Sequence, residues 1–227
     1  HEKGSSGYSL VELMENGDRD FLEWNQDGVT ERYPIAFTQE ELDYIRQYQV
    51  TSVGRCASVS LENIRKMKEY GIDVCYDFQE IFTEEEIRTL APLLRYAIFS
   101  CSHLTEEEIR YTLKLAVEQG AEIAIGTRGA RSVFAYDGER YYEQEACKVE
   151  HVVDALGAGD SFIGAFLVYY LQQDDWTEAE RIQYALRQAV KHAASVIQME
   201  GSIGIGYDVD MEQLEPLIGI AINHCSF

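Results

Sequence analysis

The sequence predicts an α/β fold in which helices cover both faces of a mainly parallel sheet. Short apolar runs of strand length alternate with helical segments between residues 38 and 126. A serine or threonine that can act as a cap precedes each of these helical segments, and Gly71 and Gly120 stand where two of them end. Strands joined through such helices run parallel, because each helix returns the chain to the end of the sheet at which the previous strand began. Such crossovers are right-handed.

The first expected element is a β-hairpin over residues 8–24. Residues 8–14 alternate apolar and polar side chains, the turn formers Asn16, Gly17 and Asp18 follow, and residues 20–24 form the second arm. The sequence contains no internal repeat and no low-complexity linker. We therefore expect one domain over residues 1–227 from which this hairpin projects.

The remaining elements place a set of polar residues at one edge of the sheet. Helices are expected at 38–48, 60–70, after Thr83, and at 105–119, 162–171 and 178–198; strands are expected at 50–53, 72–76, 96–99 and 122–126, with a hairpin of 132–136 and 140–142. Ligands of open α/β sheets bind beyond the carboxyl ends of the strands. That rim should carry Arg55, Asp77, residues 100–103, Thr127 and residues 157–160.

The composition indicates a protein that handles small molecules. A formal charge of −21 repels nucleic-acid phosphates and anionic membrane surfaces, so neither is expected as a partner. The chain has no apolar run of about 18 residues, and its first residues lack the features of a signal peptide, which favours a cytoplasmic location. The five cysteines and five histidines show no metal-ligand spacing, so a zinc site or disulfide framework is not expected.

The strongest functional signal lies in residues 154–162, Asp-Ala-Leu-Gly-Ala-Gly-Asp-Ser-Phe. Two glycines permit close approach of a ligand to the backbone, and the free amides of a following helix attract an anion. We expect Gly157, Ala158 and Gly159 to form an anion hole and Asp160 to accept a proton from an attacking hydroxyl group. The structural alternative is a tight loop in which Asp160 caps the helix.

This segment resembles the D-T-x-G-A-G-D-x-F signature of the ribokinase or PfkB family of sugar kinases, from which it departs at Ala155. The resemblance implies a ribokinase-like three-layer αβα sandwich with a small β-hairpin lid, here residues 8–24. It also implies phosphoryl transfer from ATP to a sugar hydroxyl group, with Asp160 as the base. Residues 123–132 are similar to the family's T-x-G-x-x-G motif, which assigns Thr127 and Gly129 to the nucleotide, although Ser132 replaces the second glycine.

The resemblance defines the cations less well. Transfer from ATP needs Mg²⁺ to offset charge on the phosphates. In place of the family's D-x-N and N-x-x-E patterns, however, the chain has Asp77-Phe78-Gln79 and His103-Leu104-Thr105-Glu106, so the metal ligands stay unassigned. Family members often use a monovalent cation near the glycine loop, and Ala155 leaves activation by K⁺ open.

Within the family, the chain is similar to kinases of fructoselysine, an adduct of a sugar with lysine. The matching residues are 7–24, 37–41, 76–78, 154–166 and 196–201. This resemblance implies conversion of fructoselysine into fructoselysine 6-phosphate and a homodimer formed through the β lid. Arg55, just after the strand at 50–53, is the best placed cation on the predicted rim, and we expect it to meet the substrate carboxylate. No strand with the family's G-G-N sugar-binding motif precedes His1, so the chain is expected to begin inside the domain.

Other functions stay open. The chain could be another sugar or nucleoside kinase of the family, or a non-catalytic regulator that binds sugars or nucleotides on the same fold, although the retained Asp160 argues against a regulator. A dinucleotide-dependent oxidoreductase fits poorly. Residues 157–160 lack the third glycine at the required spacing, and no acidic ribose-binding residue follows after another strand.

Overall fold

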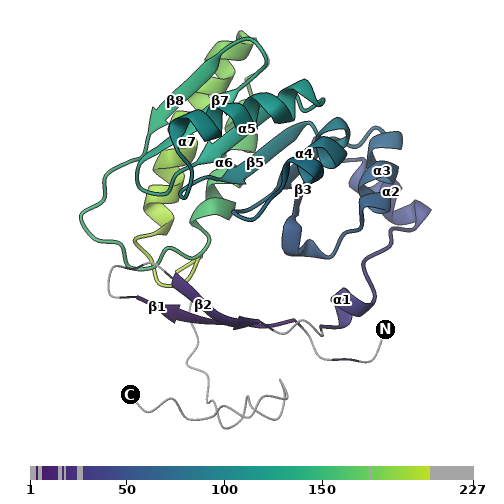
Figure 1. The fold of residues 1–227 in the computed structure, drawn as a ribbon, viewed down its shortest axis with the longest axis horizontal. Coiled ribbons are helices and arrows are strands. Elements are labelled where there is room, and N and C mark those ends of the chain that lie inside the picture. The colour runs from purple at the N-terminus through teal and green to yellow at the C-terminus, as the bar shows by residue number, and fades with distance from the viewer. Residues whose placement is uncertain are drawn as a thin grey trace.

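The computed structural model describes residues 4, 7–14, 17, 19–24, 28–173 and 175–204. Within these ranges the chain forms a six-stranded sheet with flanking helices and a separate two-stranded sheet (Figure 1). Asn16, Asp18, His1, His224 and Cys225, which entered the sequence interpretation, lie outside the described residues.

The large sheet has the strand order β3-β4-β5-β6-β7-β8. The first four strands pair in parallel, and the last two add an antiparallel hairpin. The strands are β3 (Thr51–Gly54), β4 (Val74–Asp77), β5 (Tyr96–Ser100), β6 (Ile123–Thr127), β7 (Ser132–Tyr136) and β8 (Tyr141–Glu145). The predicted mainly parallel sheet is confirmed.

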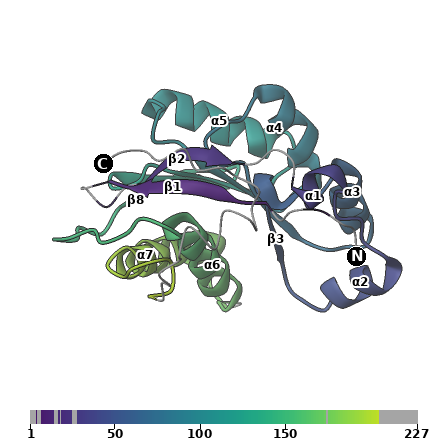
Figure 2. The same ribbon diagram turned by 90° about the horizontal axis from the view of Figure 1, so that it is seen from below.

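Helices lie on both faces of this sheet, as Figures 1 and 2 show. One face packs against α3 (Leu61–Glu69), α4 (Glu84–Leu90) and α5 (Glu106–Glu118), and the other against α6 (Ala158–Leu171) and α7 (Glu178–Val196). Side chains alternate along a strand, so β5 serves both layers: Ala97 and Phe99 enter the first core, and Tyr96 and Ile98 the second. Burial on both faces explains why its sequence is continuously apolar.

Most of the longer helices begin with the same capping device. The hydroxyl groups of Thr38, Thr83, Thr105 and Thr177 each accept a hydrogen bond from the amide three residues on, and the glutamate at that position accepts one from the threonine amide. This capping box satisfies amides that the first helical turn leaves free. It fixes the starts of α2 (Gln39–Ile45), α4, α5 and α7.

Several details differ from the sequence prediction: the helix expected at 38–48 ends at Ile45, and the strand expected at 140–142 spans Tyr141–Glu145. α6 begins at Ala158 and not at Phe162, because Gly157 at the N-cap takes a left-handed conformation (φ 74°) that turns the chain directly into the helix. A single helical turn, α1 (Val29–Arg32), was not expected; it has no buried residue and therefore leaves no apolar periodicity in the sequence.

The predicted first hairpin is present as β1 (Ser9–Leu13) and β2 (Arg19–Trp24), which pair antiparallel. It forms a sheet of its own and lies below the rim of the main sheet in Figure 1, beside the segments that precede α6 and follow α7. The register shifts between Leu10 and Val11, which marks a bulge in β1.

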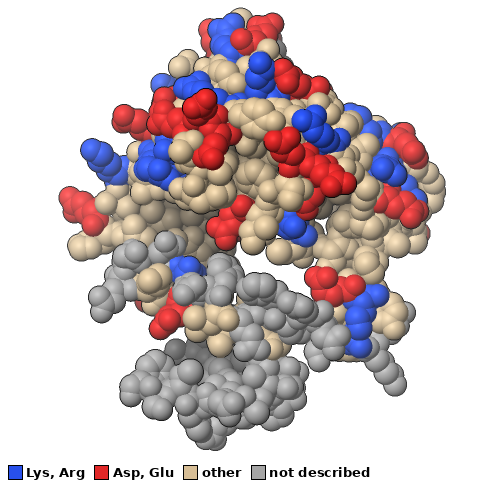
Figure 3. All heavy atoms as spheres, viewed as in Figure 1, with Lys and Arg blue, Asp and Glu red and all other residues tan. Residues whose placement is uncertain are grey.

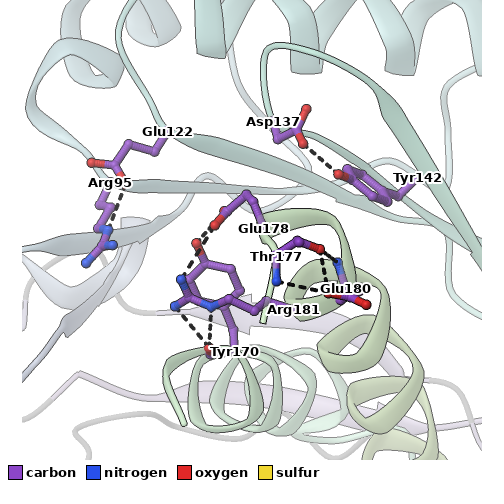
Figure 4. Close-up of polar contacts among 9 residues, drawn as sticks. All are labelled: Arg95, Glu122, Asp137, Tyr142, Tyr170, Thr177, Glu178, Glu180 and Arg181. Carbon is purple, nitrogen blue, oxygen red and sulfur yellow. Dashed lines mark hydrogen bonds and ion pairs between the residues drawn. The ribbon is translucent and has the colours of Figure 1, made fainter. Parts of the chain in front are cut away.

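The far end of α6 is fastened to α7 by one arginine (Figure 4). Arg181 lies over the ring of Tyr170, 4.2 Å from its centroid, and donates two hydrogen bonds of 3.2 Å to the Tyr170 carbonyl group. The Tyr170 hydroxyl group donates to Glu178 over 2.5 Å, and Glu178 pairs with Arg181 at 3.5 Å. These contacts join the carboxyl end of α6 to the amino end of α7.

The surface shows no large field of one sign on the face drawn in Figure 3, where acidic and basic side chains are intermingled over the helices. Charged side chains along the helices also form ion pairs, such as Glu84 with Arg88 and Glu62 with Lys66. Among the described residues, the helices are too short or too polar to cross a membrane.

Candidate active site

The carboxyl ends of the parallel strands form one rim, and the first turn of α6 reaches it. The register pairs Gly54 with Asp77 and Ser100 with Thr127, so β3 to β6 end close to the same level. Asp77 from β4 and Asp160 from α6 line one pocket of about 400 Å³. The structure thus brings together two carboxylates that lie far apart in the sequence.

The pocket combines carboxylates with small and apolar residues. It is lined by Ser52, Gly54, Cys56, Ala57, Asp77, Gln79, Asp160, Ile163, Gly164 and Leu167. Asp77 accepts a hydrogen bond of 2.8 Å from the amide of Gln79, whose backbone is left-handed (φ 58°). The pKa of Asp77 is raised, chiefly by burial, with the amide of Gln79 opposing the shift and the charge of Asp160 adding to it.

The two glycines of the loop meet different demands. Gly157 has a positive φ, and a side chain there would meet Ser202, since an added Cβ would stand 2.4 Å from the Ser202 Cβ. Gly159 has ordinary helical geometry, and an added Cβ would find no atom within 4 Å. Packing therefore requires glycine at 157 but not at 159.

Free amides border the open space beside Gly159. In the described part of the chain, the amides of Gly157, Gly159 and Asp160 have no hydrogen-bond acceptor, whereas that of Ala158 donates to the Ala155 carbonyl group over 3.2 Å. Asp160 caps nothing: the N-cap is Gly157, and no side chain caps this helix. Free amides at a helix start beside open space suit a phosphate group, which fits ATP.

Thr127 and Gly129 stand at the end of β6, outside the pocket that contains Asp160. The Thr127 hydroxyl group donates to the Phe99 carbonyl group over 3.4 Å, and Gly129 has a positive φ of 60°. Between them, the buried Arg128 pairs with Glu106 at 3.0 Å, while its Nε has no hydrogen-bond partner among the described residues. Sequence reasoning did not single out Arg128.

Arg55 lies at the rim, directly after β3, but its neighbours Gly54 and Cys56 rather than its own side chain line the pocket. Its guanidinium group pairs with Glu86 at 2.9 Å, and both side chains are about one-third exposed (36%). Glu86 belongs to a second pocket of about 340 Å³ between α3 and α4. Arg55 therefore lies between the two pockets.

The remaining candidates divide between the rim and the ion pairs around it. His103 lies beside Phe82, with ring centroids 6.3 Å apart, and Glu106 is engaged by Arg128. The described residues include no group of three or more histidine, cysteine, aspartate or glutamate side chains placed to hold a metal ion. The two carboxylates of the pocket, with no lysine or arginine among its lining residues, have the chemistry that Mg²⁺ and its waters prefer.

A buried carboxylate before the loop was not recognised as functional from the sequence. Asp154, 3% exposed, accepts hydrogen bonds from Nε of Arg19 over 2.6 Å and from Nη2 of the same residue. The amides of Leu156 and Gly201 add two more, each of 2.9 Å. The hydrogen bond from Arg19 is the main reason why the pKa of Asp154 falls to about 2. In the sequence, the only signal for Asp154 was its position as the first residue of the loop motif.

The chain matches the model of the pfkB family carbohydrate kinase over residues 2–206. It is 33% identical over 211 residues to the fructosamine kinase FrlD of Bacillus subtilis, which covers 92% of this chain and 70% of that protein. It is 27% identical over 199 residues to the fructoselysine 6-kinase of Escherichia coli, covering 88% of this chain and 71% of the relative.

Solved structures share the fold. A microbiome-derived acarbose kinase, Mak1, superposes with a TM-score of 0.68 at 20% identity, over 93% of this chain and 68% of that one. A ribokinase from Arabidopsis thaliana, complexed with ribose and ATP, gives 0.66 at 18% identity, over 95% and 70% of the respective chains. The predicted ribokinase-like architecture is confirmed.

The contrast between the glycines gives a prediction. Gly159→Val should leave the melting temperature nearly unchanged, because the added side chain enters open space and valine is no worse than glycine in a helix. It should lower turnover by about 10²-fold, as expected when an anion-binding amide is blocked. Gly157→Val is the matched control and should lower the melting temperature markedly. A Gly159→Val protein with normal turnover would support a purely structural loop.

Proposed function

Because this chain belongs to the pfkB family of carbohydrate kinases, and so is an ATP-dependent sugar kinase, we propose that it phosphorylates a sugar–amine adduct, with fructoselysine converted into fructoselysine 6-phosphate. The observation that carries the proposal is the pocket at the rim. It places Asp160 beside Asp77 and has no cationic lining residue. A carboxylate base beside an open pocket suits a substrate hydroxyl group, and the similarity to kinases of fructosamine and of fructoselysine supports an amine adduct of a sugar as the substrate.

The proposed chemistry starts from the substrate hydroxyl group. Asp160 accepts its proton as the oxygen attacks the terminal phosphorus of ATP, and the bond from that phosphorus to ADP breaks. The amides of Gly159 and Asp160 hold the phosphoryl charge, as the free donors of the first turn of α6. Asp77 and Asp160, which line the pocket, would hold Mg²⁺ or its waters, and the bound ion would offset charge on the phosphates. Thr127 and Gly129 flank the nucleotide.

Several further assignments accompany this function. The hairpin of residues 8–24 serves as a lid on a single kinase domain, and Arg55 meets the carboxylate of the amino-acid part. The hairpin also offers exposed apolar side chains for a homodimer, namely Leu10, Leu13, Met14 and Leu22. Activation by K⁺ stays open, and Asp154 in the loop is already paired with Arg19.

A substrate panel tests the proposed reaction. ATP consumption is measured with fructoselysine, fructose, ribose and cytidine, and the product is identified by NMR. Fructoselysine should give the highest kcat/KM and a product phosphorylated at its C6 hydroxyl group. Preference for ribose or cytidine would instead assign the chain to another activity within the family. Sugar binding without ATP consumption would indicate a regulator.

The role of Asp160 has its own test. Asp160→Asn should lower kcat by about 10²–10⁴-fold, because general-base assistance is typically worth that much. Folding and ATP affinity should survive, since α6 is capped by Gly157 rather than by Asp160. Asp77→Asn is the matched variant in the same pocket, with a smaller loss expected. Turnover of Asp160→Asn within about threefold of the parent would exclude Asp160 as the base.

Arg55 is tested through the substrate that needs it. Arg55→Ala should raise the KM for fructoselysine by about tenfold, because a hydrogen bond to a charged group is worth about 1.5–3 kcal/mol. The KM for fructose, which has no carboxylate, should not change. Glu86→Gln is the control, since it frees the guanidinium group and should not raise the KM for fructoselysine. An unchanged KM in Arg55→Ala contradicts the assignment.

A further inference from the structure

The turn of the β1–β2 hairpin rests directly on the chain that leads into the glycine loop. The carbonyl group of Gly17 accepts a hydrogen bond of 2.9 Å from the amide of Ala155. Gly17 is buried with a φ of 79°, and an added Cβ would lie 2.6 Å from the carbonyl oxygen of Val152. Only a glycine lets the turn come this close.

A charged contact reinforces this main-chain contact. The Arg19 guanidinium group holds both carboxylate oxygens of Asp154, and the Asp154 side chain is only 4% exposed. A two-pronged contact of this kind fixes direction as well as distance, because the guanidinium group is planar and rigid. Arg19 thus determines where Asp154 lies relative to the hairpin.

The position of Asp154 is passed on to the start of α6. Its Oδ1 accepts the amide of Leu156, and its Oδ2 accepts the amide of Gly201 from the turn after α7. The next residue, Gly157, caps α6 and packs against Ser202 of that same turn. The first turn of α6 is therefore placed by a carboxylate that the hairpin holds.

We propose that Arg19 is a positioning residue for phosphoryl transfer, which couples the hairpin to the amides of the loop and to Asp160 through the Asp154 carboxylate. The idea rests on the proposed function for the roles of the loop and of Asp160. Arg19 touches neither the pocket nor the reacting groups. Through this contact, the position of the hairpin and the position of the loop amides depend on each other.

The test uses three variants at this contact. Arg19→Gln removes the charge, Arg19→Lys keeps the charge but not the fork, and Arg19→Gln with Asp154→Asn removes both partners. Arg140→Gln is the matched control, because Arg140 is an exposed arginine whose side chain, within the described part of the chain, forms an ion pair with its neighbour Glu139 alone, at 3.8 Å. Each protein is measured for kcat, for the KM of ATP, for melting temperature and for hydrogen exchange of the amides of residues 155–161.

Arg19→Gln should lower kcat by about 10²-fold at a temperature at which the protein is folded, because small misplacements of catalytic groups have effects of that size. Arg19→Lys should lower it less, and the double variant should lose no more than Arg19→Gln, since both act through one contact. Amides 155–161 should exchange faster in each variant, and the control should match the parent.

An unchanged kcat in folded Arg19→Gln and Arg19→Lys, with only the melting temperature lowered, would overturn the proposal. If Arg19→Gln does not fold, Arg19→Lys decides the matter by the same criterion. The exchange measurement is independent of the reaction. A protein that phosphorylates no member of the substrate panel would refute the proposed function, whereas unaltered exchange at 155–161 in the variants would refute the coupling itself.

Discussion

The buried carboxylate of Asp154 is the constraint on which the glycine loop depends. Removing an ion from water costs several kcal/mol unless partners compensate it. Here a guanidinium group and two amides do so, and they come from the hairpin, the loop itself and the turn after α7. One charge therefore requires three segments to meet. These contacts fix the position of the start of α6, which carries the free amides and Asp160.

The sheet supplies the other half of the site. Beneath the rim, Phe78 stacks on Phe99 with centroids 4.6 Å apart, and Phe82 meets Phe99 edge-on at 5.0 Å. This packed floor holds the chain on both sides of the left-handed Gln79, directly after Asp77. The Asp77 carboxylate is thus held at the pocket in a half-buried position where Asp160 is its neighbour, and its raised pKa reflects that placement. Rigid elements on both sides make the spacing of the two carboxylates a property of the fold.

The loop glycines separate two kinds of requirement. Gly157 answers to packing, because its conformation and the proximity of Ser202 leave no room for a side chain. No contact with the described residues requires a glycine at 159, and the space beside it is open. This open space supports the proposal that a phosphate group binds beside Gly159. Arg128 gives a similar indication at the end of β6, where a buried cation keeps one nitrogen without a partner among the described residues.

The sequence by itself determined the order of the main elements, and it predicts the chemistry of the loop. Capping boxes such as Thr105 with Glu108 and apolar runs such as residues 96–99 are local, so the main helices and the parallel sheet could be predicted to within a few residues. Residues 157–160 are contiguous, so an anion site with an adjacent base could be inferred without knowing the fold. The same locality explains why α1, which buries nothing, escaped notice.

Only the tertiary structure decided which charges meet. Arg19 and Asp154 are 135 positions apart, and Arg55 with Glu86 and Arg128 with Glu106 are likewise distant pairs. The chain has 40 acidic residues against 19 lysines and arginines, so the sequence offers many partners for every cation. Which acidic residue pairs with each arginine depends on the common rim of the strands and on the packing of the hairpin turn against residues 152–155. Pairing of charges depends on distances in space, which no local pattern in the sequence encodes.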